Sequence, residues 1–183
     1  MNKKIALCQL LPEAHNPGRN LFLMKRTIST CSKKGAVLCI FPEDFLYGIL
    51  RNHSELVKAG KKYSYWLNHF QSFSTKYNID IIPGTFPLYN DGKLFNSTVY
   101  IDKKGNVLTQ YSKTNLWLSE RAEYTPSITP PKCFESALGK TAIIICWDIF
   151  NYKLFESAIR QGAEWIIVLS AWSMNQSDDH KIE

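Results

Sequence analysis

Long hydrophobic runs are missing from this chain of 183 residues. A membrane-spanning helix needs about 18–20 consecutive apolar residues, and no run in the sequence comes near that length. The apolar run at residues 5–7 is also too short for the core of a signal peptide, and no small-residue cleavage site follows it. We therefore expect a cytoplasmic protein with no membrane partner.

Paired cysteine and histidine motifs are missing too. The cysteines are odd in number and none forms a CxxC motif, which argues against a disulfide framework and a zinc site. Cys8 and Cys39 stand inside apolar runs, as buried free thiols do, and the others are Cys31, Cys133 and Cys146. The four histidines show no metal-ligand spacing. We expect no bound metal ion.

Acidic residues are fewer than basic ones: the chain has 16 acidic and 22 basic residues, which gives a net charge of +6. The basic residues come as isolated pairs, such as Lys33-Lys34, without interleaved aromatic residues. A nucleic-acid surface needs a clustered basic patch, so these pairs indicate solvated surface and no nucleic-acid partner. With 45% hydrophobic and 21% charged residues, the composition predicts a single globular domain over residues 1–183.

Hydrophobic periodicity predicts two strand–helix–strand units. The first has strands at residues 4–10 and 36–42 and a helix at 19–34 that Gly35 ends. The second has strands at 141–147 and 165–172 and a helix at 152–161. This order predicts an α/β protein with parallel strands covered by helices.

The stretch between the two units predicts further structure. It contains a long helical segment at residues 53–78, a strand at 79–86 that Pro83-Gly84 interrupts, and a hairpin of 94–102 with 107–112. Residues 114–131 are rich in polar residues and proline, which predicts a long loop. Loops of that length are usually functional.

Polar residues directly follow three of the predicted strands, namely Glu43, Lys113 and Cys146. Ligands of open α/β sheets bind beyond the carboxyl ends of strands, so these side chains are candidates for one site. A thiol must lose its proton to attack, a carboxylate can take that proton, and a cation can stabilise the developing oxyanion. Position alone equally fits a packed thiol, a helix-capping glutamate and a solvent-exposed lysine.

The sequence words around these residues favour the chemical interpretation. They read FPEDFLYG at Glu43, YSKTNLWLSE at Lys113 and IIICWD at Cys146. With IALCQL, GAVLCIFPE, LFNSTVYID and GAEWIIVLSAW in the same order, the chain resembles the carbon–nitrogen hydrolase (nitrilase) superfamily, in its amidase-like branch. The resemblance extends over residues 4–173, nearly the whole chain.

This resemblance implies a four-layer, nitrilase-like α-β-β-α sandwich with a Glu-Lys-Cys triad. Carried over by motif, Glu43 is the general base, Lys113 the cation that stabilises the oxyanion, and Cys146 the nucleophile. The backbone N–H of Trp147 is a second oxyanion donor. Many members have another catalytic glutamate after the lysine. Glu120 fits that place best, and Glu123 is the alternative.

The implied reaction is hydrolysis of a non-peptide C–N bond in a small-molecule amide, through a thioester on the cysteine, with release of ammonia or an amine. Asp148 is typical of the amidase branch, since members that attack nitriles tend to have glutamate there. No metal or organic cofactor is implied, because the triad supplies nucleophile, base and cation. The sequence leaves open an ω-amide, a carbamoyl amine or an aliphatic amide as substrate. Candidates for lining the pocket or packing the core are Trp117, Trp147, Trp172 and Tyr47.

The chain departs from the family pattern at two sequence positions and in its length. Asn151-Tyr152-Lys153 stands where relatives have a Phe-Pro-Glu-like word, and Ser127 stands where many have glycine. Family members continue past the SAW-like word with a further helix and strands. We therefore expect the N-terminal two thirds of the usual fold, incomplete at the C-terminus, and a homo-oligomer if the fold is completed. A fragment, a truncated gene product and half of a split enzyme all fit this expectation.

The main alternative function is that of a catalytically inactive relative acting as a binding or scaffold protein. Gly139-Lys140-Thr141 suggests a nucleotide site, but a phosphate loop needs a glycine where Phe134 stands and a helix after the threonine. A serine hydrolase is excluded because the chain has no GxSxG motif.

Overall fold

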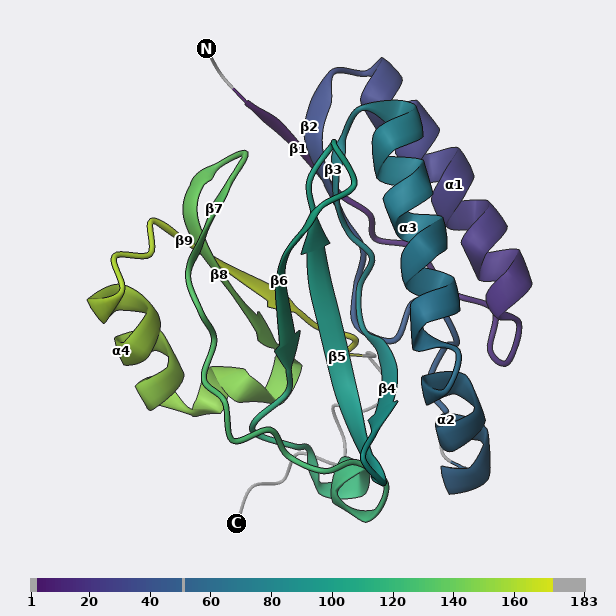
Figure 1. The fold of residues 1–183 in the computed structure, drawn as a ribbon, viewed down its shortest axis with the longest axis vertical. Helices are drawn as coiled ribbons and strands as arrows, with labels where there is room; N and C mark the ends of the chain where they lie inside the picture. The colour runs from purple at the N-terminus through teal and green to yellow at the C-terminus, as the bar shows by residue number, and fades with distance from the viewer. Residues whose placement is uncertain (1–2, 51, 173–183) are drawn as a thin grey trace.

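Two β-sheets lie face to face between helices in the computed structural model, which describes residues 3–50 and 52–172 (Figure 1). The first sheet has the strand order β1-β2-β3-β5-β4, and β6 also pairs with β5. Its strands are β1 (Lys4–Leu7), β2 (Ala36–Ile40), β3 (Asp80–Ile82), β4 (Phe86–Asn90), β5 (Lys93–Ile101) and β6 (Val107–Ser112). The second sheet has the order β7-β8-β9, with β7 (Phe134–Ser136), β8 (Gly139–Ile145) and β9 (Trp165–Leu169).

The two predicted strand–helix–strand units are both present. Strand β1 pairs in parallel with β2, and α1 (Pro17–Lys33) connects them. Strand β8 pairs in parallel with β9, and α4 (Tyr152–Arg160) connects those. Gly35 has a φ of +77° just after α1, so a residue without a Cβ ends this helix as predicted.

Helices cover the outer side of each sheet, as Figure 1 shows. Helices α1, α2 (His53–Gly60) and α3 (Tyr63–Tyr77) lie on one side and α4 on the other. One apolar core forms between the first three helices and the first sheet, and it includes Met24, Ile28 and Phe70. A second core contains Leu38 of the first sheet and Ile143 of the second, so the two sheets pack on each other. Within the described ranges, no helix is long and apolar enough to cross a membrane.

The long helix predicted at residues 53–78 is instead two helices. Helix α2 ends at Gly60, and α3 begins at Tyr63. A Cβ on Gly60 would lie 2.8 Å from the backbone nitrogen of Tyr89 in β4, so only glycine allows this close approach. The apolar periodicity continues through the break because both helices bury a face on the same sheet. The sequence pattern therefore could not show where the helix axis changes.

The interruption predicted at Pro83-Gly84 separates two strands, β3 and β4. Gly84 lies between them with a φ of +80°, in the left-handed region that favours glycine. A Cβ there would meet the backbone oxygen of Pro42 at an impossible 2.0 Å. The chain thus turns tightly against Pro42, the residue that precedes Glu43.

Short 3-10 helices replace the irregular chain predicted near two of the strand ends. One, η1 (Leu118–Ala122), lies within the loop predicted at residues 114–131. The other, η2 (Cys146–Phe150), begins directly after β8, so Cys146 and Trp147 are not part of the strand predicted at 141–147. Helix α4 begins at Tyr152 as predicted, although Asn151 makes no side-chain capping hydrogen bond.

Candidate active site

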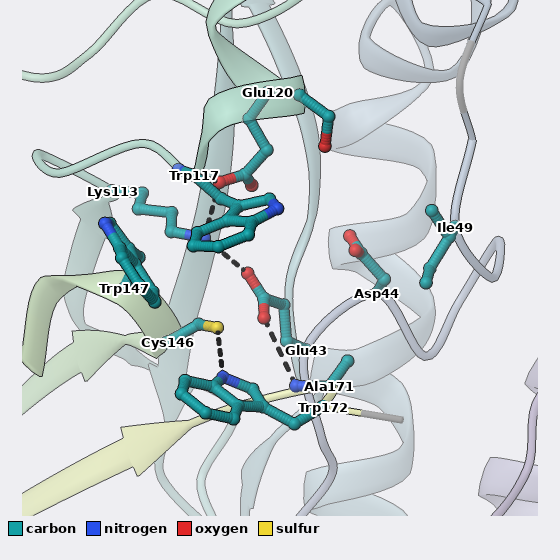
Figure 2. A pocket seen from close by; sticks show the side chains of 11 residues that line it. Glu43, Asp44, Ile49, Lys113, Trp117, Glu120, Cys146, Trp147, Ala171 and Trp172 are labelled. Atoms are coloured by element: carbon teal, nitrogen blue, oxygen red, sulfur yellow. Dashed lines mark hydrogen bonds and ion pairs between the residues drawn. The ribbon is translucent and has the colours of Figure 1, made fainter. Parts of the chain in front are cut away.

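Glu43, Lys113 and Cys146 lie close together where strands of both sheets end (Figure 2). The first two follow β2 and β6 of the first sheet, and Cys146 follows β8 of the second. The Lys113 Nζ lies 2.9 Å from the Glu43 Oε1, and both side chains are buried. The fold therefore brings together the three residues that the strand ends indicated.

The Lys113 ammonium lies between two carboxylates. Besides Glu43, it contacts the Oε2 of Glu120 at 2.7 Å. The backbone N–H of Trp117 also donates to that Oε2, at 2.7 Å, which fixes the carboxylate at the start of η1. Glu123 instead contacts the exposed ring of His53, at 3.1 Å. Of the two glutamates considered from the sequence, Glu120 is the one beside the lysine.

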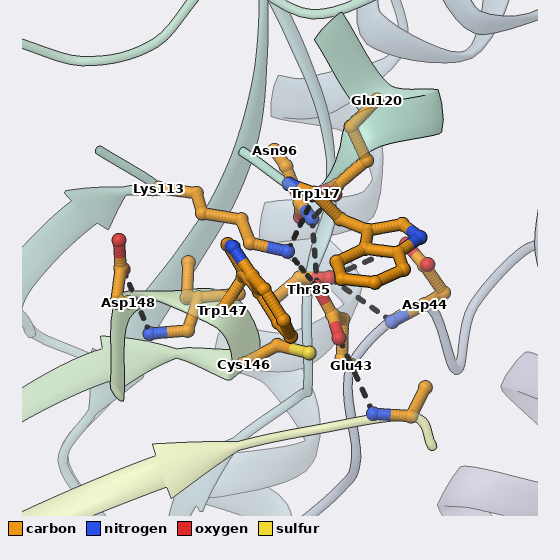
Figure 3. Close-up of polar contacts among 12 residues, drawn as sticks. Glu43, Asp44, Thr85, Asn96, Lys113, Trp117, Glu120, Cys146, Trp147 and Asp148 are labelled. Atoms are coloured by element: carbon orange, nitrogen blue, oxygen red, sulfur yellow. Dashed lines mark hydrogen bonds and ion pairs between the residues drawn. The ribbon is translucent and has the colours of Figure 1, made fainter. Parts of the chain in front are cut away.

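Asn96 connects the same two carboxylates (Figure 3). Its Nδ2 donates to the Glu43 Oε1 and to the Glu120 Oε1, each at 3.1 Å. The side chain is buried, and its Oδ1 has no hydrogen-bond partner among the described residues. From sequence, this residue was noted only within the word LFNSTVYID. The available signal was a run of three polar residues, Asn96-Ser97-Thr98, between the apolar ends of β5.

Cys146 stands in a strained backbone conformation, with a φ of +44°. Such a conformation costs a non-glycine residue about 1–3 kcal/mol and persists only where the surroundings hold it. Asp148 supplies that support, since its buried carboxylate accepts hydrogen bonds from the two segments that meet here. The donors are the backbone N–H groups of Ile145, Thr114 and Asn115 and the hydroxyl of Tyr111. Asp148 therefore ties the end of β8 to the segment that follows Lys113.

The segment after β9 completes this group of contacts. The indole Nε1 of Trp172 donates to the Cys146 Sγ at 2.9 Å. The backbone N–H of Ala171 donates to the Glu43 Oε2 at 3.2 Å, so each oxygen of that carboxylate is held by a different element. Both contacts appear as dashed lines in Figure 2.

Comparison with known proteins decides the family. A sequence model described as "Carbon-nitrogen hydrolase" matches residues 4–181. The chain belongs to the carbon–nitrogen hydrolase family. The class of enzyme predicted from the motifs, an amidase-type carbon–nitrogen hydrolase, is thereby confirmed.

Individual relatives agree with this assignment. A probable nitrilase of Schizosaccharomyces pombe is 27% identical over 98% of this chain and 67% of its own length. A deaminated glutathione amidase of Synechocystis sp. is 25% identical over 98% of this chain and 71% of its own. A crystal structure of an amidase from Nesterenkonia sp. superposes with a TM-score of 0.86 at 22% identity, covering 98% of this chain and 69% of the other. The superposition confirms the nitrilase-like α/β fold.

Burial and neighbouring charges set the electrostatics of this hydrolase site. Burial opposes the charge on Lys113, but Glu43 and Glu120 outweigh it and hold the lysine pKa above its usual value. The pKa of Glu43 is raised, mainly by burial and with a contribution from Glu120, against the opposing effect of Lys113. Two carboxylates that share one ammonium cannot both be fully compensated, so a raised pKa for one of them is expected.

The thiol of Cys146 is protonated in the resting hydrolase site. Burial, with a smaller contribution from the charge of Glu43, raises its pKa to about 11. The site at neutral pH therefore contains a thiol and an ammonium beside Glu43. Proton transfer from sulfur to Glu43 must accompany any attack by the sulfur.

A cavity of about 90 Å³ opens onto these groups. Glu43, Lys113, Glu120 and Cys146 line it, together with three indoles from Trp117, Trp147 and Trp172. The ring centroids of Trp117 and Trp147 are 4.1 Å apart, and those of Trp147 and Trp172 are 6.1 Å apart. Tyr47, the fourth aromatic candidate, is instead a core residue whose hydroxyl accepts from the Trp66 indole at 2.6 Å.

Proposed function

We propose that this chain hydrolyses the C–N bond of small carboxamides through a thioester on Cys146. The observation that supports this most strongly is the Lys113 ammonium, held at 2.9 Å from Glu43 and 2.7 Å from Glu120 beside the cavity that Cys146 lines. The site thus combines a nucleophile, a proton acceptor and a fixed cation. These are the three components that acyl transfer requires.

Acylation begins when Glu43 takes the proton of the Cys146 thiol. The sulfur attacks the amide carbonyl carbon, and the carbonyl oxygen becomes an oxyanion. Lys113 and the backbone N–H of Trp147 stabilise that oxyanion. The Trp147 N–H lies in the first turn of η2, where backbone N–H groups have no acceptor within the helix.

Collapse of this intermediate breaks the C–N bond. Glu43 returns its proton to the leaving nitrogen, so ammonia or an amine departs and the thioester remains. Glu43 then takes a proton from water, the hydroxide attacks the thioester carbon, and the carboxylic acid is released as the sulfur regains a proton. Glu120 and Asn96 act as positioning residues, because they fix Lys113 and Glu43 by direct contacts.

The substrate is proposed to be an aliphatic amide with a short acyl group. The cavity of about 90 Å³ suits a small group, and its indoles offer apolar walls to the acyl chain. A second cavity of about 440 Å³ shares Glu43 and Trp172 with it and gives room for a longer substituent. A panel of amides of increasing chain length, assayed by ammonia release, measures where the limit lies.

The pH dependence of kcat/KM for ammonia release tests the roles of the two carboxylates. Glu43 must be ionised to accept the thiol proton, so kcat/KM falls as the pH drops through the raised pKa of Glu43. Above the pKa of Glu43 it levels off, and it changes again near pH 11, where Cys146 loses its proton. The Glu120→Gln variant removes a neighbouring negative charge and is expected to move the acid limb to lower pH.

Glu123→Gln is the matched control, because Glu123 contacts His53 rather than Lys113. This variant is expected to keep the acid limb of the parent. An acid limb that moves in Glu123→Gln and stays in place in Glu120→Gln would contradict the assignment of Glu120.

A further inference from the structure

Three cysteine thiols meet on the side of the first sheet that faces α1, and none of them belongs to the catalytic group. Cys8 follows β1, Cys31 lies on α1, and Cys39 lies in β2. Their Sγ atoms all lie within 4.8 Å of one another, and those of Cys8 and Cys39 are 3.2 Å apart. All three are free cysteines. Sequence spacing did not predict this convergence, because three separate elements supply the thiols.

The surroundings of this three-thiol cluster are apolar. Cys8 and Cys39 are buried and belong to the core between α1 and the first sheet. Cys31 is partly exposed and packs against the same core. An ion can therefore enter past Cys31 and bind away from bulk water.

We propose that Cys8, Cys31 and Cys39 bind one soft metal ion, with Cu(I) as the physiological ligand. Thiolate sulfur is the donor that selects soft ions such as Cu(I). A metal–sulfur bond of about 2.3 Å, the value known for zinc thiolates, places three sulfurs around a central ion about 4 Å apart. The Cys8–Cys39 contact must open by roughly 0.8 Å, which side-chain rotation can provide.

The number of available ligands favours Cu(I) over zinc. Zinc prefers four ligands in a tetrahedral arrangement. In residues 3–50 and 52–172, the metal-ligating group comprises these three thiols and no further His, Cys, Asp or Glu. A three-coordinate ion matches this set, whereas zinc would need a fourth donor from outside it.

Binding of the ion must displace the thiol protons, because thiolates are the ligands. Affinity for the ion should therefore rise with pH.

A competition titration on the whole chain tests this site. Cys146→Ala serves as the parent, because it removes the catalytic thiol, and the protein is kept reduced and anaerobic. Bicinchoninate is the competing Cu(I) chelator. We expect the parent to remove one Cu(I) per chain from the bicinchoninate complex. We expect Cys31→Ser to weaken Cu(I) binding by about 100-fold or more, since even changes outside the ligand set reduce metal affinity 10–100-fold.

Cys133→Ser in the same parent is the matched control, because Cys133 is also partly exposed and lies outside the cluster. Its Cu(I) affinity is expected to equal that of the parent. Cys31→Ser is preferred to the Cys39 variant because Cys39 is fully buried, and matched thermal unfolding without metal verifies that Cys31→Ser folds. The site is overturned if the reduced parent fails to compete, or if Cys31→Ser binds Cu(I) as the parent does.

Discussion

Replacing Cys146 by alanine is expected to lower kcat/KM for ammonia release from a short aliphatic amide by about 10⁴-fold or more. Removal of a catalytic nucleophile has effects of this size, because the covalent route is lost and not merely slowed. In the proposed mechanism the sulfur is the atom that attacks the carbonyl, and neither Lys113 nor Glu43 can replace it. Initial rates of ammonia release, measured for parent and variant at equal concentration, provide the test.

Alanine at this position should leave the fold intact. The strained φ of +44° at Cys146 is held by the hydrogen bonds of Asp148, not by the thiol. Cys133→Ala is the control for general thiol loss, because Cys133 does not line the cavity, and this variant is expected to keep full activity. Equal activity of Cys146→Ala and Cys133→Ala would rule out the proposed nucleophile.

The Lys113→Met variant is expected to lose about 3–5 kcal/mol of unfolding free energy at neutral pH. Breaking a buried ion pair costs this much because the remaining charge is left without a partner. Here two carboxylates, Glu43 and Glu120, would remain without their ammonium. The variant should also lose activity about 10²–10³-fold, since a donor to the oxyanion is removed.

The stability loss of Lys113→Met should depend on pH in a defined direction. Without the lysine, the pKa of Glu43 in the folded state rises further above its value in the unfolded state. A carboxyl with a raised folded-state pKa is destabilising at high pH, and this penalty disappears as the pH falls and the group is protonated. Urea unfolding should therefore show the largest difference from the parent at neutral pH and a smaller one in acid.

Arg160→Met is the matched control for the loss of an ion pair. Arg160 contacts Glu156 at 2.9 Å on the exposed face of α4, and an exposed pair contributes under about 1 kcal/mol. If Lys113→Met were no less stable than Arg160→Met, the buried ion pair described for the site would be contradicted.

The positions of the strand ends explain why much of the site was predictable from sequence. Short runs that are apolar on both faces mark buried parallel strands, and the first polar residue after such a run lies at the sheet edge. Glu43 and Cys146 follow strands of this kind, and Lys113 follows a hairpin strand. Short motifs then provided the roles, and the structure provides the distances.

The features that sequence did not reveal depend on tertiary contacts. The break at Gly60 exists because the backbone of Tyr89 lies too close for a Cβ. The interruption at Gly84 was predictable, but its close contact with the Pro42 backbone was not. Asn96 acquires its importance only when Glu43 and Glu120 approach it from elsewhere in the chain. The same holds for the three-thiol cluster, whose members are not related by any local spacing. Hydrophobic periodicity describes one helix or strand at a time, so it carries no information about contacts between residues of different elements.

Partitioning of the acyl group between water and hydroxylamine tests the thioester most directly. Two substrates with the same acyl group but different leaving groups, an amide and its N-methylamide, are hydrolysed with hydroxylamine present, and acid and hydroxamate are measured. A shared thioester on Cys146 predicts the same acid-to-hydroxamate ratio for both substrates, and no hydroxamate from Cys146→Ala. A ratio that differs with the leaving group, or one that survives in Cys146→Ala, would contradict acyl transfer through this cysteine.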